Sequence, residues 1–99
     1  MTLSEEKKQK ILGYIQKHLK GEEPYEVLLF GSYATGKAHS KSDIDIAIKA
    51  QQKLSLSKWQ KLESALEESD IIEKIDVVDF HRASEGFQKI ILESAKPLS

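Results

Sequence analysis

Residues 25–50 read YEVLLFGSYATGKAHSKSDIDIAIKA, and this stretch decides the fold. Its first part, residues 25–30, is a short apolar run closed by Gly31, which predicts a strand buried on both faces. Its last part, residues 43–50, alternates between apolar and other residues as a second strand does. In that alternation Ile44, Ile46 and Ile48 face one way, and Asp43, Asp45 and Ala47 face the other.

Helical patterns lie outside this stretch. Residues 2–20 predict a helix, because Ile11, Ile15 and Leu19 repeat at four-residue spacing and a glycine follows. Ser57 and Gln60 form a capping box that predicts the start of another helix, running to about residue 69.

The C-terminal part predicts a third strand and a last helix. Residues 74–80, KIDVVDF, are rich in β-branched residues. Ser84 can cap a helix whose apolar face includes Phe87, Ile90 and Ile91 and which ends near Pro97. The whole order predicts an α/β (α+β) fold, a small mixed three-stranded sheet packed with about four helices, as a single domain over residues 1–99.

Composition narrows the class of protein. Hydrophobic residues make up 39% and charged residues 31% of the 99 residues, which favours a folded globular chain over a disordered or membrane-spanning one. The formal net charge of -1 argues weakly against direct binding of nucleic acid. The lack of cysteine excludes disulfides and thiolate metal sites. The charged N-terminus has the pattern of neither a secretory signal nor a membrane helix, so we expect a cytoplasmic protein.

Gly31 and Ser32 directly follow the first strand. A glycine there lets the backbone approach a ligand, and successive N–H groups with the Ser32 hydroxyl can donate to phosphate oxygens. Taken alone, the pair is more typical of an ordinary turn, with Gly31 for the bend and Ser32 as the N-cap of a helix.

Asp43 and Asp45 lie two residues apart on a strand, so both carboxylates leave the same face. Two like charges about 4 Å apart repel by on the order of 4 kcal/mol at an effective dielectric near 20, unless water or a cation screens them. A divalent ion such as Mg²⁺ takes oxygen ligands of this kind. A solvated strand face with no metal is the alternative.

Asp76 supplies a third acid on another strand. Asp79 cannot share its face, because alternation groups Asp76 with residues 78 and 80. If a right-handed helical crossover joins the second and third strands, they run parallel and Asp76 lies beside Asp43 and Asp45. The first strand must then be antiparallel to the second for Gly31 to reach the same place.

The order G-S, S-D-I-D and a later Asp resembles the nucleotidyltransferase superfamily that includes DNA polymerase β. It is most similar to the minimal nucleotidyltransferases, which are partners of HEPN-type helical proteins. The resemblance implies nucleotide binding by Gly31 and Ser32, and metal binding and catalysis by Asp43, Asp45 and Asp76. The implied cofactor is Mg²⁺ or Mn²⁺, and the implied substrate is a nucleoside triphosphate, ATP in the first instance.

The loop departs from the family at two positions. Many relatives carry arginine at one or both of the positions that Tyr33 and Thr35 occupy here, so this loop has less fixed positive charge. Lys37 and Lys41 can compensate, although each also fits a solvated loop lysine. His39 and His81 flank the proposed site in sequence, but a lone loop histidine has no assured role, so neither is among the expected catalytic residues.

Two functions of different classes remain. The first is a metal-dependent transferase that moves a nucleoside monophosphate, AMP from ATP, to an acceptor hydroxyl, on a HEPN-type partner as the antitoxin of a two-component system. The second is a non-catalytic antitoxin or regulatory subunit that covers a helical partner. A generic α/β domain with fortuitous acids is a third reading. Because a chain of this size has no second domain to grip the acceptor, we expect a hetero-oligomer, with Leu54, Leu56 or Leu98 as contact residues.

Overall fold

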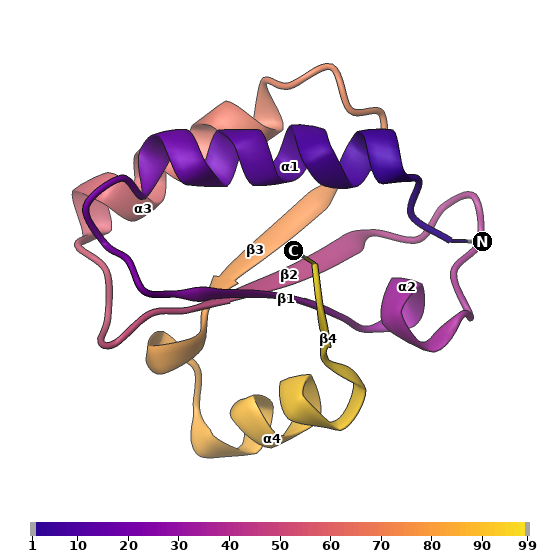
Figure 1. The fold of residues 1–99 in the computed structure, drawn as a ribbon. Coiled ribbons are helices and arrows are strands. Elements are labelled where there is room, and N and C mark those ends of the chain that lie inside the picture. Colours follow the sequence, from indigo (N-terminus) through magenta and orange to yellow (C-terminus); the bar gives the residue numbers. More distant parts are fainter. Residues whose placement is uncertain (1, 99) are drawn as a thin grey trace.

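The computed structural model describes residues 2–98. Along the chain (Figure 1) the elements are α1 (Glu5–His18), β1 (Glu26–Phe30), α2 (Ser32–Thr35), β2 (Ile44–Lys49), α3 (Leu56–Glu67), β3 (Ile75–Asp79), a 3₁₀ turn η1 (Phe80–Arg82), α4 (Glu85–Ser94) and β4 (Lys96–Pro97). The predicted order of helices and strands is therefore confirmed, with each boundary within a few residues of its expected place.

The strands form one mixed sheet in the order β3-β2-β1-β4. β1 is antiparallel to β2, and β2 is parallel to β3, as the sequence predicts. The prediction of three strands is wrong, because Lys96 and Pro97 pair antiparallel with β1 as a fourth strand. A two-residue strand is too short to show any periodicity, so only its place beside β1 reveals it.

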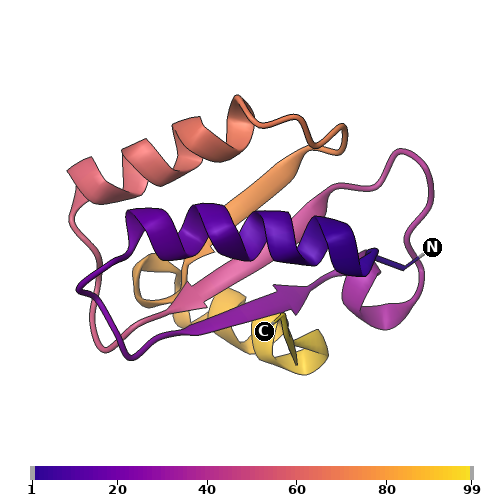
Figure 2. The same cartoon turned by 45° about the horizontal axis from the view of Figure 1, so that its top comes forward.

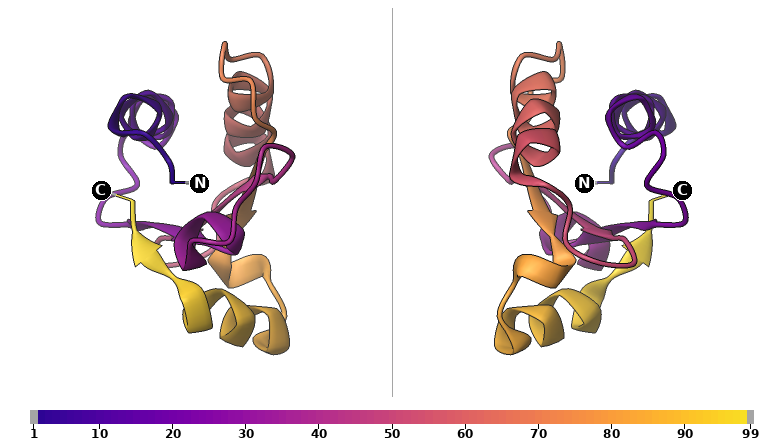
Figure 3. Two further views of the ribbon diagram at one scale, coloured as in Figure 1. Left: turned by 90° about the vertical axis from the view of Figure 1, so that its right-hand side faces the viewer. Right: turned by 90° about the vertical axis from the view of Figure 1, so that its left-hand side faces the viewer.

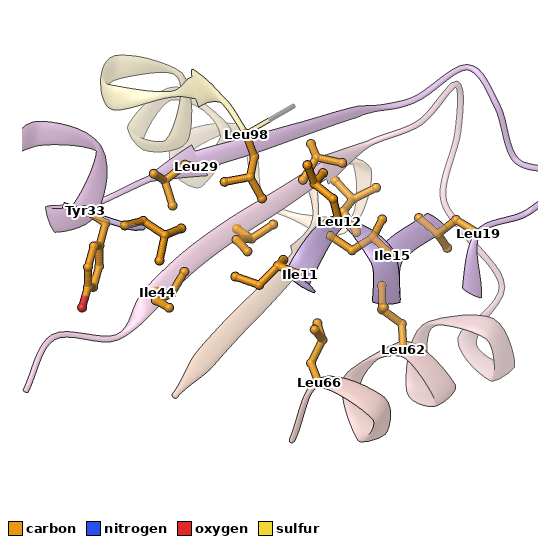
Figure 4. Close-up of a cluster of buried hydrophobic side chains, with 14 of the residues drawn as sticks. Ile11, Leu12, Ile15, Leu19, Leu29, Tyr33, Ile44, Leu62, Leu66 and Leu98 are labelled. Carbon is orange, nitrogen blue, oxygen red and sulfur yellow. The ribbon is translucent and has the colours of Figure 1, made fainter. Parts of the chain in front are cut away.

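The helices cover the sheet on both faces. α1 and α3 lie side by side over one face, and α4 lies under the other (Figures 2 and 3). The larger core lies between the sheet and the α1 and α3 pair, where the side chains of α1, α3 and β2 interlock (Figure 4). Its fully buried members include Ile11, Ile15, Leu19, Ile44, Ile46, Ile48 and Leu62.

A smaller core fills the opposite face of the sheet, beneath α4. It contains Leu28, Phe30, Ala47, Phe80 and Ile91. Alternation along β2 therefore sends the isoleucines to one core and Ala47 to the other, as predicted. Strand β1 is buried on both faces, also as predicted.

The cap of α3 is not the predicted one. Ser55 caps the helix and accepts the N–H of Lys58 at 3.2 Å, whereas Ser57 lies exposed inside the first turn. Leu54 before the cap and Trp59 within the first turns are both buried in the larger core. This apolar pair is a hydrophobic staple, and it selects Ser55 over a serine two residues later.

Helix α4 begins at the predicted cap, since Ser84 accepts the N–H of Phe87 at 3.2 Å. It ends at Ser94, a few residues before the predicted end near Pro97, because the chain turns there into β4. Ile91 is buried, as predicted. Ile90 is 56% exposed, so its predicted place on the buried face is wrong.

Of the three leucines expected to contact a partner, only Leu56 is exposed, at 58%. Leu54 and Leu98 are 2% and 6% exposed, so that part of the prediction is wrong. Leu98 follows β4 along β1, donates its N–H to the Val27 carbonyl at 2.8 Å and points into the larger core (Figure 4). Within residues 2–98, no helix has the length and apolar character needed to cross a bilayer.

Candidate active site at the edge of the sheet

Three strand ends meet at one edge of the sheet. β1 ends there at Phe30, while β2 and β3 begin there at Ile44 and Ile75, with α2 beside them (Figure 1). This follows from the strand directions, since β1 runs against the other two. All five residues expected at the site, Gly31, Ser32, Asp43, Asp45 and Asp76, lie at or next to these ends.

Asp45 and Asp76 are directly paired in the register of β2 and β3. Neighbouring strands lie about 4.8 Å apart, so the two carboxylates leave the same face side by side. Asp43 comes immediately before β2, two residues from Asp45, and adds a third negative charge. The sheet therefore brings the three predicted acids together.

Asp79 lies on the opposite face and has a different environment. It is 3% exposed, and its carboxylate accepts the N–H groups of Leu54 at 2.9 Å and His81 at 3.2 Å. Arg82 Nε lies 3.5 Å from it. These contacts tie the start of α3 to the end of β3, so Asp79 has a structural role and is turned away from the three acids.

Asp45 lies where its charged form is disfavoured. Burial raises its pKa to about 6, and the negative charges of Asp76 and Asp43 add to the effect. The ionised cluster is therefore unfavourable in the folded chain, and a cation placed among these oxygens would relieve it.

Gly31 is required beside Asp45 for two reasons. Its backbone has φ 74° and ψ -152°, a conformation that residues with a β-carbon rarely adopt. A β-carbon on Gly31 would also overlap Asp45 Oδ2 and lie 3.3 Å from Asp45 Cγ. The carboxylate thus occupies the space that glycine leaves.

The turn after β1 presents unpaired donors. Gly31 is the N-cap of α2, and its carbonyl accepts the N–H groups of Ala34 at 3.1 Å and Thr35 at 3.2 Å. The N–H groups of Ser32 and Tyr33 have no acceptor among residues 2–98. Ser32 is the first residue of α2 and not its cap, which leaves its hydroxyl free of a capping bond. Such a turn can donate to phosphate oxygens.

The fit of a divalent ion can be judged from the donor set. Asp43, Asp45 and Asp76 offer hard carboxylate oxygens, which suit Mg²⁺ or Mn²⁺. Within residues 2–98, however, no three acidic or histidine side chains converge as a finished ligand set. The ammonium group of Lys74 forms an ion pair with Asp76, with Nζ 3.7 Å from Oδ1. The three acids therefore fit the ion in chemistry and charge, but the described side chains do not form a complete ligand set.

The two histidines and two lysines considered from the sequence lie in different surroundings. His81 Nε2 lies 2.6 Å from the Ala50 carbonyl, beyond the far end of β2, so His81 is outside the site. His39 Nδ1 accepts the N–H of Lys41 at 3.2 Å within its own loop. The ammonium groups of Lys37 and Lys41 make no ion pair with the described residues. Sequence reasoning missed Ser94, whose hydroxyl accepts the N–H of Gly31 at 3.1 Å.

The chain is similar in sequence to known nucleotidyltransferases. The family model "Polymerase beta, Nucleotidyltransferase" matches residues 9–99. A probable protein adenylyltransferase MntA of Haemophilus influenzae is 39% identical over 67 residues, which cover 68% of this chain. The match spans 59% of that relative's own length, and 51% of the length of the MntA of Shewanella oneidensis, so the chain matches a little over half of each.

Two solved structures are similar in fold and sequence. The crystal structure of a toxin-antitoxin with AMP-PNP superposes with a TM-score of 0.60 and 34% identity, covering 88% of this chain and 71% of the other. A tri-AMPylated Shewanella oneidensis HEPN toxin in complex with MNT antitoxin superposes with a TM-score of 0.55 and 32% identity, covering 93% of this chain and 71% of the other.

Proposed function

Since the chain belongs to the polymerase β-type nucleotidyltransferase family, we propose that it transfers AMP from ATP to an acceptor hydroxyl, with a HEPN-type helical protein as acceptor and partner. Support comes from the relatives. One is named a probable protein adenylyltransferase, and one similar structure is of an AMPylated HEPN toxin with MNT antitoxin. The chain would then be the antitoxin of a two-component system.

The observation that carries this proposal is the pairing of Asp45 with Asp76 beside Gly31. A binding protein has no need to hold paired carboxylates where burial and mutual repulsion raise a pKa to about 6. A catalytic site that must hold divalent ions and a triphosphate does have that need.

In the proposed reaction, the N–H groups of Ser32 and Tyr33 and the Ser32 hydroxyl hold triphosphate oxygens. Asp43, Asp45 and Asp76 would hold Mg²⁺ or Mn²⁺, which when bound stabilises charge on the entering and leaving oxygens. The acceptor oxygen forms a bond to the α-phosphorus, and the bond from that phosphorus to the pyrophosphate oxygen breaks. Asp76, whose side chain is 44% exposed, orients the acceptor hydroxyl and receives its proton.

The test is transfer of label from α-³²P-ATP to a co-purified HEPN-type partner in the presence of Mg²⁺ or Mn²⁺. Asp45→Asn and Asp76→Asn should each lower the rate on the order of 10²-fold or more, because each removes charge stabilisation at the reacting phosphate. Asp70→Asn is the matched control, since Asp70 is an exposed acid that pairs with Lys10 away from the site. Full transfer by Asp76→Asn would overturn the assignment.

The same experiment separates the enzyme from the binding subunit. A complex that forms without any label transfer by the unaltered chain would support the non-catalytic alternative. Isothermal titration of Mg²⁺ with ATP adds a second measurement, in which Asp43→Ala and Asp45→Ala should each weaken binding.

The acceptor must be held by something other than this site. We propose that residues 1–99 form one nucleotidyltransferase domain, whose three acids lie where β1 ends and β2 and β3 begin. Orientation of the acceptor is a large share of catalysis, so a partner that presents its own hydroxyl meets the need. Because ATP is an intracellular substrate, we also propose a cytoplasmic location for the chain.

A further inference from the structure

The hydroxyl of Ser94 and the N–H of Gly31 join two segments 63 positions apart, with a donor-acceptor distance of 3.1 Å. Gly31 begins the turn that would hold the triphosphate, and Ser94 is the last residue of α4. The bond therefore ties the far end of the chain to the candidate site.

The register of the sheet explains this contact. β4 pairs with β1 so that Leu28 faces Pro97 and Leu29 faces Lys96. Continuing that register by two residues places Gly31 opposite Ser94. There the chain is still helical, so the backbone ladder has ended, and the serine side chain supplies the acceptor instead. Figure 3 shows β4 leaving the end of α4 and running along the sheet edge.

Glycine loses more conformational freedom on ordering than any other residue type, so the backbone conformation at Gly31 depends strongly on such restraints. Its carbonyl is held by the N–H groups of α2, and its α-carbon faces the Asp45 carboxylate. Ser94 holds the third group, the N–H. These three restraints fix the direction of the Ser32 and Tyr33 donors that follow.

We propose that Ser94 is a positioning residue for nucleotide binding, acting through Gly31. This inference rests on the proposed function. Ser94 restrains the Gly31–Ser32 turn so that its donors point at the triphosphate before ATP arrives. Its loss releases the turn, and ATP binding must then include the ordering of that turn.

The expected effect of Ser94→Ala is a rise of about two- to tenfold in the Kd and KM for ATP, the equivalent of one neutral hydrogen bond. The rise in KM should exceed any fall in kcat, because the three acids and the acceptor are untouched. Ser94→Thr keeps the hydroxyl and should restore the affinity. Ser64→Ala, at an exposed serine near the end of α3, controls for a helical serine-to-alanine change.

The bond itself can be observed by NMR hydrogen exchange without any activity. The Gly31 amide should exchange faster in Ser94→Ala than in the unaltered chain, Ser94→Thr or Ser64→Ala, at equal global stability. A fluorescent ATP analogue with Mg²⁺ would then give the affinity of each variant.

The outcomes are separable. Faster Gly31 exchange with weaker ATP binding, both reversed in Ser94→Thr, supports the inference. Unchanged Gly31 exchange, or unchanged ATP affinity in Ser94→Ala, overturns it while the unaltered chain still binds ATP. Failure of the unaltered chain to bind ATP at millimolar concentration would overturn the proposed function itself, and with it the role assigned to Ser94.

Discussion

Replacement of Gly31 by alanine tests the centre of the candidate site. Two separate penalties are expected, because the backbone at this position favours glycine and because the new β-carbon overlaps Asp45 Oδ2. The first penalty belongs to Gly31 alone, whereas the second depends on Asp45. The two can therefore be measured apart.

The magnitudes follow from the geometry. A residue other than glycine at φ 74° and ψ -152° costs about 2 kcal/mol of backbone strain. Moving a half-buried carboxylate out of contact costs roughly another 1–2 kcal/mol. Gly31→Ala should thus lower the free energy of unfolding by about 3–4 kcal/mol, which corresponds to a fall in Tm of roughly 12–30 °C for a domain of this size.

Urea denaturation followed by the fluorescence of the single, buried Trp59 would measure this change. Gly36→Ala is the matched control, because Gly36 also has positive φ, at 77°, but a β-carbon there would meet nothing within 4 Å. That control should lose only about 1 kcal/mol. In an Asp45→Ala background, the penalty of Gly31→Ala should shrink by about 1–2 kcal/mol, since the overlapping oxygens are gone.

Two results would refute the reasoning. If Gly31→Ala destabilised the chain no more than Gly36→Ala, the close approach of Asp45 would be wrong. If the penalty were the same with and without the Asp45 carboxylate, the two residues would not be in contact.

The remaining predictions concern four other side chains. Because the pKa of Asp45 is raised to about 6, its ionised form is unfavourable in the folded chain, and the stability that this group contributes falls as pH rises from about 4 through 6. In urea titrations without metal, Asp45→Asn should be more stable than the unaltered chain at pH 8, by on the order of 1 kcal/mol after allowing for solvent screening. The two proteins should be equally stable near pH 3.5. An unfavourable effect of Asp45→Asn at pH 8 would contradict this. Asp79→Ala should lose about 3 kcal/mol by the same titration, because it removes the carboxylate beside the Arg82 guanidinium and leaves the buried Leu54 N–H without an acceptor. Asp76→Ala, at a half-exposed side chain, should lose less than about 0.5 kcal/mol, and equal losses would contradict the difference in burial between the two acids. Tyr33→Phe should leave stability unchanged or raise it by up to about 1 kcal/mol, because the buried Tyr33 hydroxyl has no partner among the described residues, and a loss above about 1 kcal/mol in calorimetry would reveal a hydrogen bond.

Much of the candidate site could be predicted from the local periodicity of the sequence. Alternation along residues 43–50 was enough to separate the buried isoleucines from the acids, and the same period separated Asp76 from Asp79. The handedness of a βαβ crossover then gave the parallel pairing of β2 with β3. These inferences needed only the period of a strand and a rule of chirality, so the sequence alone was sufficient.

Contacts between distant segments required the tertiary structure. The choice of Ser55 over Ser57 as a cap depends on where Leu54 packs, and the burial of Leu98 depends on β4 lying along β1. The raised pKa of Asp45 depends on burial and on the two neighbouring acids together. The bond from Ser94 to Gly31 depends on the register between two segments 63 positions apart. Periodicity predicts on which face of a strand or helix a side chain lies. It does not predict which residue that side chain contacts, because the contact depends on strand register and on packing across the sheet.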